Sequence, residues 1–197
     1  MSATASDKRV VDRGSARERL LAAADELFYE HGVHTVGIDT VIARAGVAKA
    51  SLYSTFGSKD ALIEAYLVQR FEERNERVRQ GIAKHDEPRA KMLAVFDVAD
   101  AAISKPTYRG CAFINASAEG LPGGVEEAVS ARARGWLREL FTDLARDAGI
   151  KDAKALGDQL GMLYDGAIIS ARLDRKKKAA QAAKAAAAVL IDAAAAR

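Results

Sequence analysis

Apolar residues recur at intervals of three and four positions along almost the whole of this 197-residue chain, and this helical periodicity restricts its fold more than any other feature. No run of alternating β-branched residues marks a strand. Only three prolines interrupt the pattern, and alanine, the strongest helix former, is abundant. We therefore expect an all-α protein whose helices pack their apolar faces into a core.

The composition excludes several classes of protein. Lys and Arg number 30 against 27 Asp and Glu, a surplus too small to diagnose nucleic-acid binding. The one cysteine, Cys111, rules out an internal disulfide and a cysteine-based zinc site, and it is typical of a reducing compartment, so we expect the cytoplasm. No apolar span is long enough to cross a membrane, and residues 1–14 lack the apolar core of a secretory signal.

Capping and breaking residues divide the periodic pattern into separate helices. Ser15 and Glu18 have capping-box spacing, Ser58 is a good N-cap, and glycines supply stops. The charged residues 70–79 are expected to be a solvated stretch that links to the rest of the chain. The helices expected on these grounds cover residues 15–31, 38–45, 48–56, 59–79, 88–105, 108–119, 125–148, 152–172 and 179–196.

Residues 36–62 carry most of the functional information. Two short helical patterns flank a tight turn, where Gly46 supplies the permissive backbone that such a turn needs. Val41, Val47 and Leu52 are placed to pack the two helices together, which leaves the other face of the second helix in solvent. This arrangement predicts a helix-turn-helix, in which the second helix enters the DNA major groove.

The exposed face of that second helix predicts a set of DNA contacts. Lys49 can reach a base edge or a phosphate, the Tyr53 hydroxyl can donate to a phosphate, and small neighbours let the backbone approach the bases. Lys59 lies in the first turn of the following helix, where its charge and the free N–H groups can meet a phosphate. The candidate DNA-binding residues are Gly37, Thr40, Lys49, Ala50, Ser51, Tyr53, Ser54 and Lys59.

The segment from about residue 17 to about residue 66 resembles the DNA-binding domain of the TetR family of bacterial transcriptional regulators. The residues that carry the resemblance are Leu27, Phe28, Gly46, Val47, Ala48, Leu52, Tyr53, Phe56, Ser58, Lys59 and Leu62. The resemblance implies an N-terminal three-helix DNA-binding domain, a larger C-terminal helical domain for ligand binding and dimerisation, and a homodimer. It also implies that the positions of Lys49, Ala50, Ser51 and Tyr53 touch DNA and that Lys59 binds phosphate.

Three positions depart from the family pattern. Gly37 stands where a threonine is often found; it can still cap a helix but offers no hydroxyl to a phosphate. Ala48 replaces a common serine, and Thr55 replaces a common histidine or tyrosine. The expected organisation is a basic arm over residues 1–14, which either follows DNA or only aids solubility, a DNA-binding domain over residues 15–78, and a ligand-binding and dimerisation domain over residues 79–197.

The C-terminal part gives weaker signals for a ligand pocket. Residues 108–119 mix apolar and polar side chains, as small-molecule sites do. Aromatic and methionine side chains at helical spacing either line the pocket that the resemblance implies or pack in the core. Cys111 is either a redox or electrophile sensor or an inert buried thiol, and its apolar neighbours favour the inert thiol. The candidate ligand-binding residues are Phe96, Cys111, Phe113, Asn115, Trp136, Met162 and Tyr164.

The last two helices predict a dimer interface. Residues 152–172 carry an apolar stripe wider than a helix normally buries within one protomer, and the alanine-rich residues 179–196 permit close helix approach. A lone recognition helix reads only one half-site, which also favours a homodimer. The basic residues 175–178 are either a solvated loop or a second nucleic-acid patch. The candidate interface residues are Leu156, Leu160, Leu163, Ile168, Val189 and Leu190.

We therefore expect a ligand-responsive transcriptional regulator without cofactor or metal, and specifically a repressor that binds a palindromic operator and is released by a small molecule. An activator would use the same residues. An enzyme is disfavoured, because the three histidines form no metal spacing and no nucleophile elbow or phosphate-binding glycine loop is present. A helical scaffold that has lost DNA binding is disfavoured by Lys49, Tyr53 and Lys59.

Overall fold

The structure, a computed structural model, describes residues 14–196, and every regular element in that range is an α-helix. The expectation of an all-α protein is confirmed. The expected basic arm lies outside the described residues except for Gly14. The described helices are α1 (Ala16–His31), α2 (Ile38–Ala45), α3 (Lys49–Phe56), α4 (Lys59–Ile82), α5 (Pro88–Ile103), α6 (Ala112–Glu119), α7 (Val125–Asp147), α8 (Ala153–Leu173) and α9 (Ala179–Ala195).

The capping signals set the boundaries of the N-terminal helices as the sequence predicts. At the start of α1 the Ser15 backbone N–H donates to Glu18 Oε2 at 2.7 Å, and the Glu18 N–H donates to Ser15 Oγ at 3.2 Å. These two bonds form a complete capping box. Ser58 Oγ accepts the Ala61 N–H at 3.1 Å and begins α4 in the same manner.

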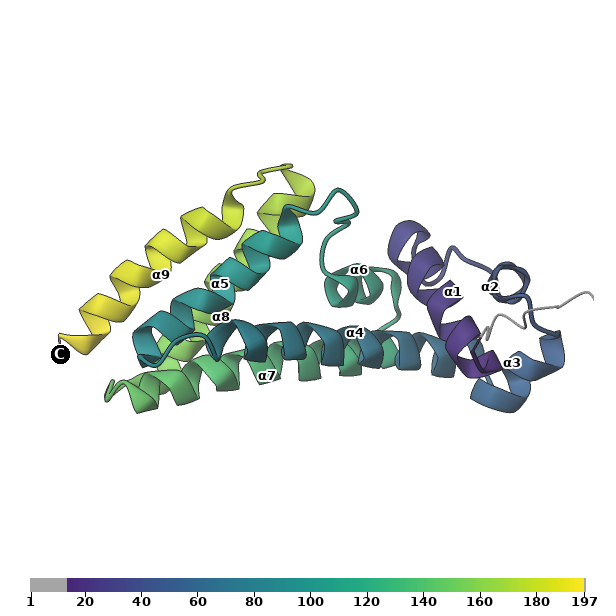
Figure 1. Ribbon diagram of the computed structural model, residues 1–197, viewed down its shortest axis with the longest axis horizontal. Helices are drawn as coiled ribbons and strands as arrows, with labels where there is room; N and C mark the ends of the chain where they lie inside the picture. The colour runs from purple at the N-terminus through teal and green to yellow at the C-terminus, as the bar shows by residue number, and fades with distance from the viewer. Residues whose placement is uncertain (1–13, 197) are drawn as a thin grey trace, which may run out of the picture.

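The helices are arranged along one long axis (Figure 1). Helices α1, α2 and α3 gather at one end, and α9 lies at the other end. Helix α4 is 24 residues long and runs from this cluster into the rest of the molecule, with α7 alongside it. A helix of this length spans about 36 Å, so α4 is a continuous rod shared by both parts of the protein.

Two hydrophobic cores lie along this rod. The first joins α1 to α4 with α6 and the start of α7, and it includes Phe28, Tyr66 and Phe113. The second joins the far end of α4 with α5, α7, α8 and α9, around Phe96 and Phe141. The expected domain boundary at residue 78 therefore falls inside a helix, and α6 and the start of α7 share the core around α1, α2 and α3.

None of the helices in residues 14–196 combines the length and the apolar character that crossing a membrane requires.

Candidate nucleic-acid interface and internal cavity

Helices α2 and α3 pack against each other through the side chains that the sequence identified. Val41 and Leu52 are fully buried, and Val47 packs partly buried against the same core. Gly46 ends α2 at φ 63°, in the left-handed region that favours glycine. A Cβ at this position would meet no atom within 4 Å, so the backbone conformation, rather than crowding, requires the glycine.

The outer face of α3 is open to solvent. Tyr53 keeps 47% of its surface exposed, and its hydroxyl makes no hydrogen bond to any described residue. The hydroxyls of Ser54 and Thr55 both donate to the carbonyl oxygen of Ser51, at 3.2 and 2.6 Å, so they are already used within the helix. Ser51 itself is partly buried, whereas Lys49, Ala50, Tyr53 and Ser54 are exposed.

Lys49 is held by a partner that the sequence did not reveal. Its Nζ lies 2.9 Å from Oδ1 of Asp39, in the first turn of α2, and this bond raises the pKa of the Lys49 ammonium. Both side chains are exposed, so the pair contributes little to stability and can be exchanged for a phosphate or a base edge. Only the geometry of the turn brings these two residues together, which is why residue spacing alone did not predict the pair.

The starts of α2 and α4 complete this surface. Lys59 is the first residue of α4, and its Nζ donates to the carbonyl oxygen of His34 at 3.4 Å. Gly37 begins α2 with an extended backbone, and the nearest atom to a Cβ there would be Oγ1 of Thr40 at 3.9 Å. All eight candidate DNA-binding residues therefore lie on α3 or on the first turns of α2 and α4, including their N-caps.

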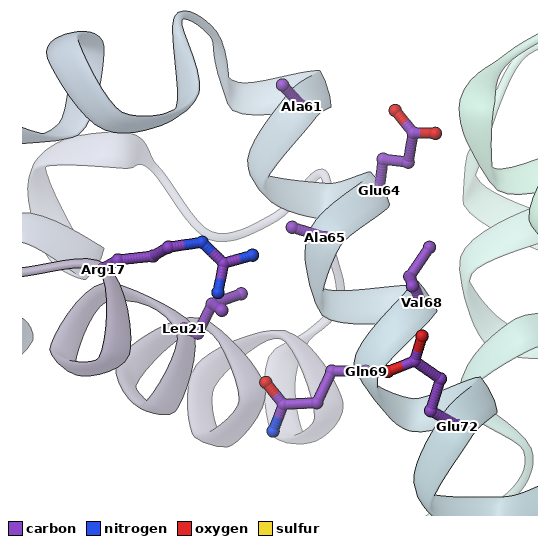
Figure 2. A pocket seen from close by; sticks show the side chains of 8 residues that line it. All are labelled: Arg17, Leu21, Ala61, Glu64, Ala65, Val68, Gln69 and Glu72. Carbon is purple, nitrogen blue, oxygen red and sulfur yellow. The ribbon is translucent and has the colours of Figure 1, made fainter.

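A shallow groove of about 380 Å³ lies between α1 and α4 (Figure 2). Arg17 and Leu21 line it from α1, and α4 supplies the remaining side chains. These include Glu64 and Glu72, whose carboxylates would repel a phosphate. The groove contains none of the candidate DNA-binding residues and is not assigned to that interface.

A cavity of about 210 Å³ lies where α1, α4, α5, α6 and α8 meet. Three of the seven candidate ligand-binding residues line it, namely Cys111, Phe113 and Tyr164. Burial raises the pKa of the Cys111 thiol, so little reactive thiolate exists near neutral pH. This supports the inert thiol over the sensor.

The other four candidate ligand-binding residues lie outside the cavity lining. Phe96 is fully buried in the second core, where its ring stacks on Phe141 with centroids 5.8 Å apart. Met162 is 61% exposed on α8. Asn115 donates to the carbonyl oxygen of Arg109 at 3.0 Å, and Trp136 packs edge-on against Phe71.

The cavity is also lined by cations that the sequence analysis assigned to a solvated stretch. Arg70, Arg74 and Arg77 of α4 all face it. Arg70 makes a paired contact with Asp25 of α1, and Asn75 is buried beside Arg74. The expectation of simple solvation was wrong for Arg70 and Arg74, which are partly buried because α4 passes between α1 and α7, whereas Arg77 is exposed as expected. Their spacing of four and three residues, which places them on one helix face, was the signal available in the sequence.

Direct hydrogen bonds join α1 and the loop before α2 to the segment before α6, to α6 and to α7. The Tyr29 hydroxyl donates to the carbonyl oxygen of Gly110 at 2.9 Å. The His34 N–H donates to Glu119 Oε2 at 3.0 Å, and the His34 ring lies 2.9 Å from the buried carboxylate of Glu126. These bonds connect α6 and α7 to His34, whose backbone carbonyl oxygen also accepts the hydrogen bond from Lys59 Nζ.

The structure places most of the candidate dimer residues inside the protomer. Leu156, Leu160 and Ile168 are buried in the second core, and Leu163 and Leu190 are partly buried against it. The reason is that α8 has two apolar faces, and the sequence stripe marked the one that packs internally. The face left exposed carries Met162, Ile169 and Leu173, and α9 exposes Val189.

Helix α3 packs against α2 across the turn at Gly46 and leaves its outer face exposed. This arrangement defines the chain as a helix-turn-helix protein. The family profile described as bacterial regulatory proteins, tetR family, matches residues 20–66. The structure of SCO4454, a TetR-family transcriptional regulator from Streptomyces coelicolor, is similar with a TM-score of 0.85 and 32% identity, covering 91% of this chain and 96% of that one. The chain belongs to the TetR family of bacterial transcriptional regulators.

Two further relatives agree with this assignment. The structure of sav143 from Streptomyces avermitilis is 30% identical with a TM-score of 0.77, covering 92% of this chain and 98% of that one. The HTH-type transcriptional activator FasR from Mycolicibacterium smegmatis is 35% identical over 85 residues, which are 43% of this chain and 39% of FasR. More than half of FasR therefore lies outside the match. Because the family consists of transcriptional regulators, the enzyme alternative is set aside.

Proposed function

We propose that the protein is a ligand-responsive repressor that binds a roughly palindromic operator as a homodimer. One recognition helix from each protomer enters successive major grooves, and a small molecule in the cavity between α1, α4, α5, α6 and α8 releases the DNA. The protein works in the cytoplasm, where it meets its operator.

The observation that carries this proposal is the exposed face of α3 beside the start of α4. Lys49 and Tyr53 lie on that face, and Lys59 lies at the N-terminus of the next helix. Side chains of these types supply base-edge and phosphate contacts, and a helix N-terminus attracts phosphate.

The exposed apolar face of α8 supports a second copy of the chain as the partner. Met162, Gly166, Ile169 and Leu173 recur at intervals of four, three and four residues, so they share one helix face. Leu173 is 74% exposed and Met162 is 61% exposed, and a Cβ at Gly166 would meet no atom, so another helix can approach closely there. A two-fold dimer buries the same face on both protomers and pairs two recognition helices.

The cavity supports control by an effector because one of its lining residues, Tyr29, also belongs to the DNA-binding domain. Tyr29 belongs to α1, lines the cavity and bonds to the segment before α6. A ligand that moves this wall changes the position of α1 and hence the separation of the two recognition helices. Half-sites one helical turn apart, about 34–36 Å, tolerate little change in that separation.

Lysine substitutions test the assigned DNA contacts. Lys59→Ala should weaken binding to all duplexes and reduce the slope of log K against log salt by about 0.9 per protomer, because one phosphate contact is lost. Lys49→Ala should also relax base preference. Lys84→Ala, an exposed lysine beyond the far end of α4, is the control and should change neither.

Asp39→Asn provides the reciprocal test, because it frees Lys49 and removes a negative charge beside the DNA. DNA affinity should rise. If Lys59→Ala and Lys84→Ala had equal effects on fluorescence anisotropy titrations, or if Asp39→Asn weakened binding, the assigned interface would be wrong.

Activation is the second candidate function, because one similar protein, FasR, is named as an activator. Transcription in vitro from a promoter that carries the selected operator separates the two. A repressor lowers transcript yield when added without effector, whereas an activator raises it.

A further inference from the structure

Arg74 is a partly buried cation without a carboxylate partner. Its Nη2 donates to the carbonyl oxygen of Ala133 at 2.8 Å and to Oδ1 of Asn75 at 3.0 Å, and both acceptors are neutral. None of the hydrogen bonds or ion pairs among residues 14–196 involves its Nη1 group. The guanidinium carbon also lies 5.1 to 5.8 Å from the ring centroids of Phe113, Phe71 and Trp136, but these rings carry no net charge that would neutralise it. Because a charge taken partly out of water is normally paired, a guanidinium that faces a cavity with free donors marks a place for an anion.

The other charged groups of the cavity have the same sign. Arg70, Arg77 and Lys105 also line it, and none of the lining residues is Asp or Glu. Asp25 neutralises Arg70, and Glu73 lies 3.9 Å from the exposed Arg77. Arg74 and Lys105 have no such partner among the described residues, so the cavity carries a net positive charge.

The rest of the lining is aromatic and apolar. Tyr29, Tyr108, Tyr164 and Phe113 surround the arginines, with Ile168 from α8. Burial raises the pKa of both Tyr108 and Tyr164, so these phenols stay protonated. The Tyr108 hydroxyl already donates to the carbonyl oxygen of Ile168 at 3.3 Å, which leaves the Tyr164 hydroxyl as the donor for a ligand. At about 210 Å³ the cavity is smaller than the pockets of about 300–1,000 Å³ that hold drug-sized ligands.

A cationic groove adjoins the cavity. It has a volume of about 620 Å³ and shares Lys105 and Tyr108 with the cavity lining. Its other charged residues are Arg109, Arg172, Arg175 and Lys177, against one carboxylate, Glu30. Such a concentration of one charge raises the local concentration of oppositely charged ligands.

We propose that this cavity binds a small organic anion, a carboxylate with one ring or a short hydrocarbon chain, whose acid group is held by Arg74. The proposal rests on the proposed function, since it names the chemical class of the effector. Lys105 and the cationic groove guide the anion in, and Arg74 pairs with its carboxylate through the free Nη1 donors. The apolar body lies against Phe113, Tyr164 and Ile168.

Trp136 reports binding directly, because it is the only tryptophan in the chain and Arg74 lies 5.8 Å from its ring centroid. The experiment titrates the full-length protein with three acids, benzoate, phenylacetate and hexanoate, and with their neutral amides, and follows tryptophan fluorescence. The expected result is that at least one acid binds about ten-fold or more tightly than its amide, since the hydrogen bonds are made to a charged group.

Two variants separate the Arg74 contact from a general change in fluorescence. Arg74→Met should abolish the preference for the acid. Arg79→Met is the matched control, because Arg79 also lies over Trp136, at 5.4 Å from the ring centroid, but does not line the cavity. If Arg74→Met fails to fold, Lys105→Met, which removes an exposed rim cation, should still weaken acid binding several-fold and leave amide binding unchanged.

Equal affinities for acid and amide, the absence of binding by all three acids at millimolar concentration, or an acid preference that survives in Arg74→Met would each overturn the proposal. DNA binding by the same preparation is measured separately by anisotropy. If the protein binds DNA but shows no preference for the acid, the proposed function stands and the anion site is wrong. If the protein prefers the acid but binds no duplex, the anion site stands and the proposed function is wrong.

Discussion

The hydroxyl of Tyr29 bridges two parts of the chain by donating to the carbonyl oxygen of Gly110 at 2.9 Å and accepting the backbone N–H of Arg109 at 2.9 Å. Tyr29 lies in α1, within the DNA-binding end, and Gly110 lies just before α6 in the cavity wall. The guanidinium of Arg70 lies 4.0 Å from the centroid of the same ring. The Tyr29 side chain thus connects α1 of the DNA-binding domain with α4 and with the cavity wall.

Removing this hydroxyl should cost stability. Tyr29→Phe loses both hydrogen bonds and keeps the ring, so the free energy of unfolding should fall by about 1–2 kcal/mol. Urea denaturation followed by circular dichroism measures the change. Tyr53→Phe is the control, because the Tyr53 hydroxyl bonds to no described residue, and its unfolding free energy should stay within about 0.5 kcal/mol of the parent. A loss of the same size in both variants would contradict the bridging role.

Backbone conformation predicts that replacing glycine by alanine has opposite effects on stability at Gly46, in the turn between α2 and α3, and at Gly135, inside α7. Gly46→Ala forces an L-residue into the left-handed region and should lower the unfolding free energy by about 1–2 kcal/mol. Gly135→Ala, inside α7, should raise it by about 0.5–1 kcal/mol through helix propensity. An added Cβ meets nothing within 4 Å at either site, so packing cancels from the comparison. Thermal or urea unfolding measures both changes. If both variants changed the unfolding free energy in the same direction, the left-handed backbone at Gly46 would not be the reason that this turn needs glycine.

The exposed face of α8 predicts where dimerisation can be blocked. Ile169→Glu and Leu173→Glu place a carboxylate in the proposed two-fold interface, where it would be desolvated without a partner. Sedimentation at micromolar concentration should show monomers with unchanged helix content. Ala131→Glu adds the same charge to an exposed position on α7 and should remain dimeric. Dimers that persist in both α8 variants would place the interface elsewhere.

The raised pKa of Cys111 predicts slow reaction with electrophiles. Alkylation by iodoacetamide at pH 7 should be about ten-fold slower or more than for an exposed cysteine, because the thiolate is the nucleophile. The rate should continue to rise with pH beyond the ordinary thiol value of about 8.5, since burial shifts the titration upward. Mass spectrometry follows the reaction without ambiguity, as the chain has one cysteine. Rapid alkylation at neutral pH would favour the sensor.

The helix boundaries were largely predictable because their signals are local. Ser15 with Glu18, Gly46 and Ser58 each act through hydrogen bonds or backbone conformation within four residues, and each does in the structure what the sequence indicates. The buried and exposed faces of α2 and α3 followed from Val41 and Leu52 for the same reason.

The cavity and the interface were less predictable because they depend on contacts between distant segments. Leu160 and Met162 both belong to an apolar helix, and only the positions of α5, α7 and α9 decide that Leu160 is buried and Met162 exposed. Arg74 appears in the sequence as one charge in a polar run. Its role depends on α7, which supplies the carbonyl oxygen of Ala133, and on the cavity formed by α6 and α8.

The central claim is that two copies of α3 read two half-sites of one operator. Selection of bound duplexes from a random DNA pool, with the full-length protein at moderate salt, tests it most directly. The account predicts enrichment of an inverted repeat whose half-site centres are about one helical turn apart, and loss of that enrichment in Lys49→Ala. Enrichment of a single unrepeated site, or of no sequence by folded protein that sediments as a dimer, would contradict it.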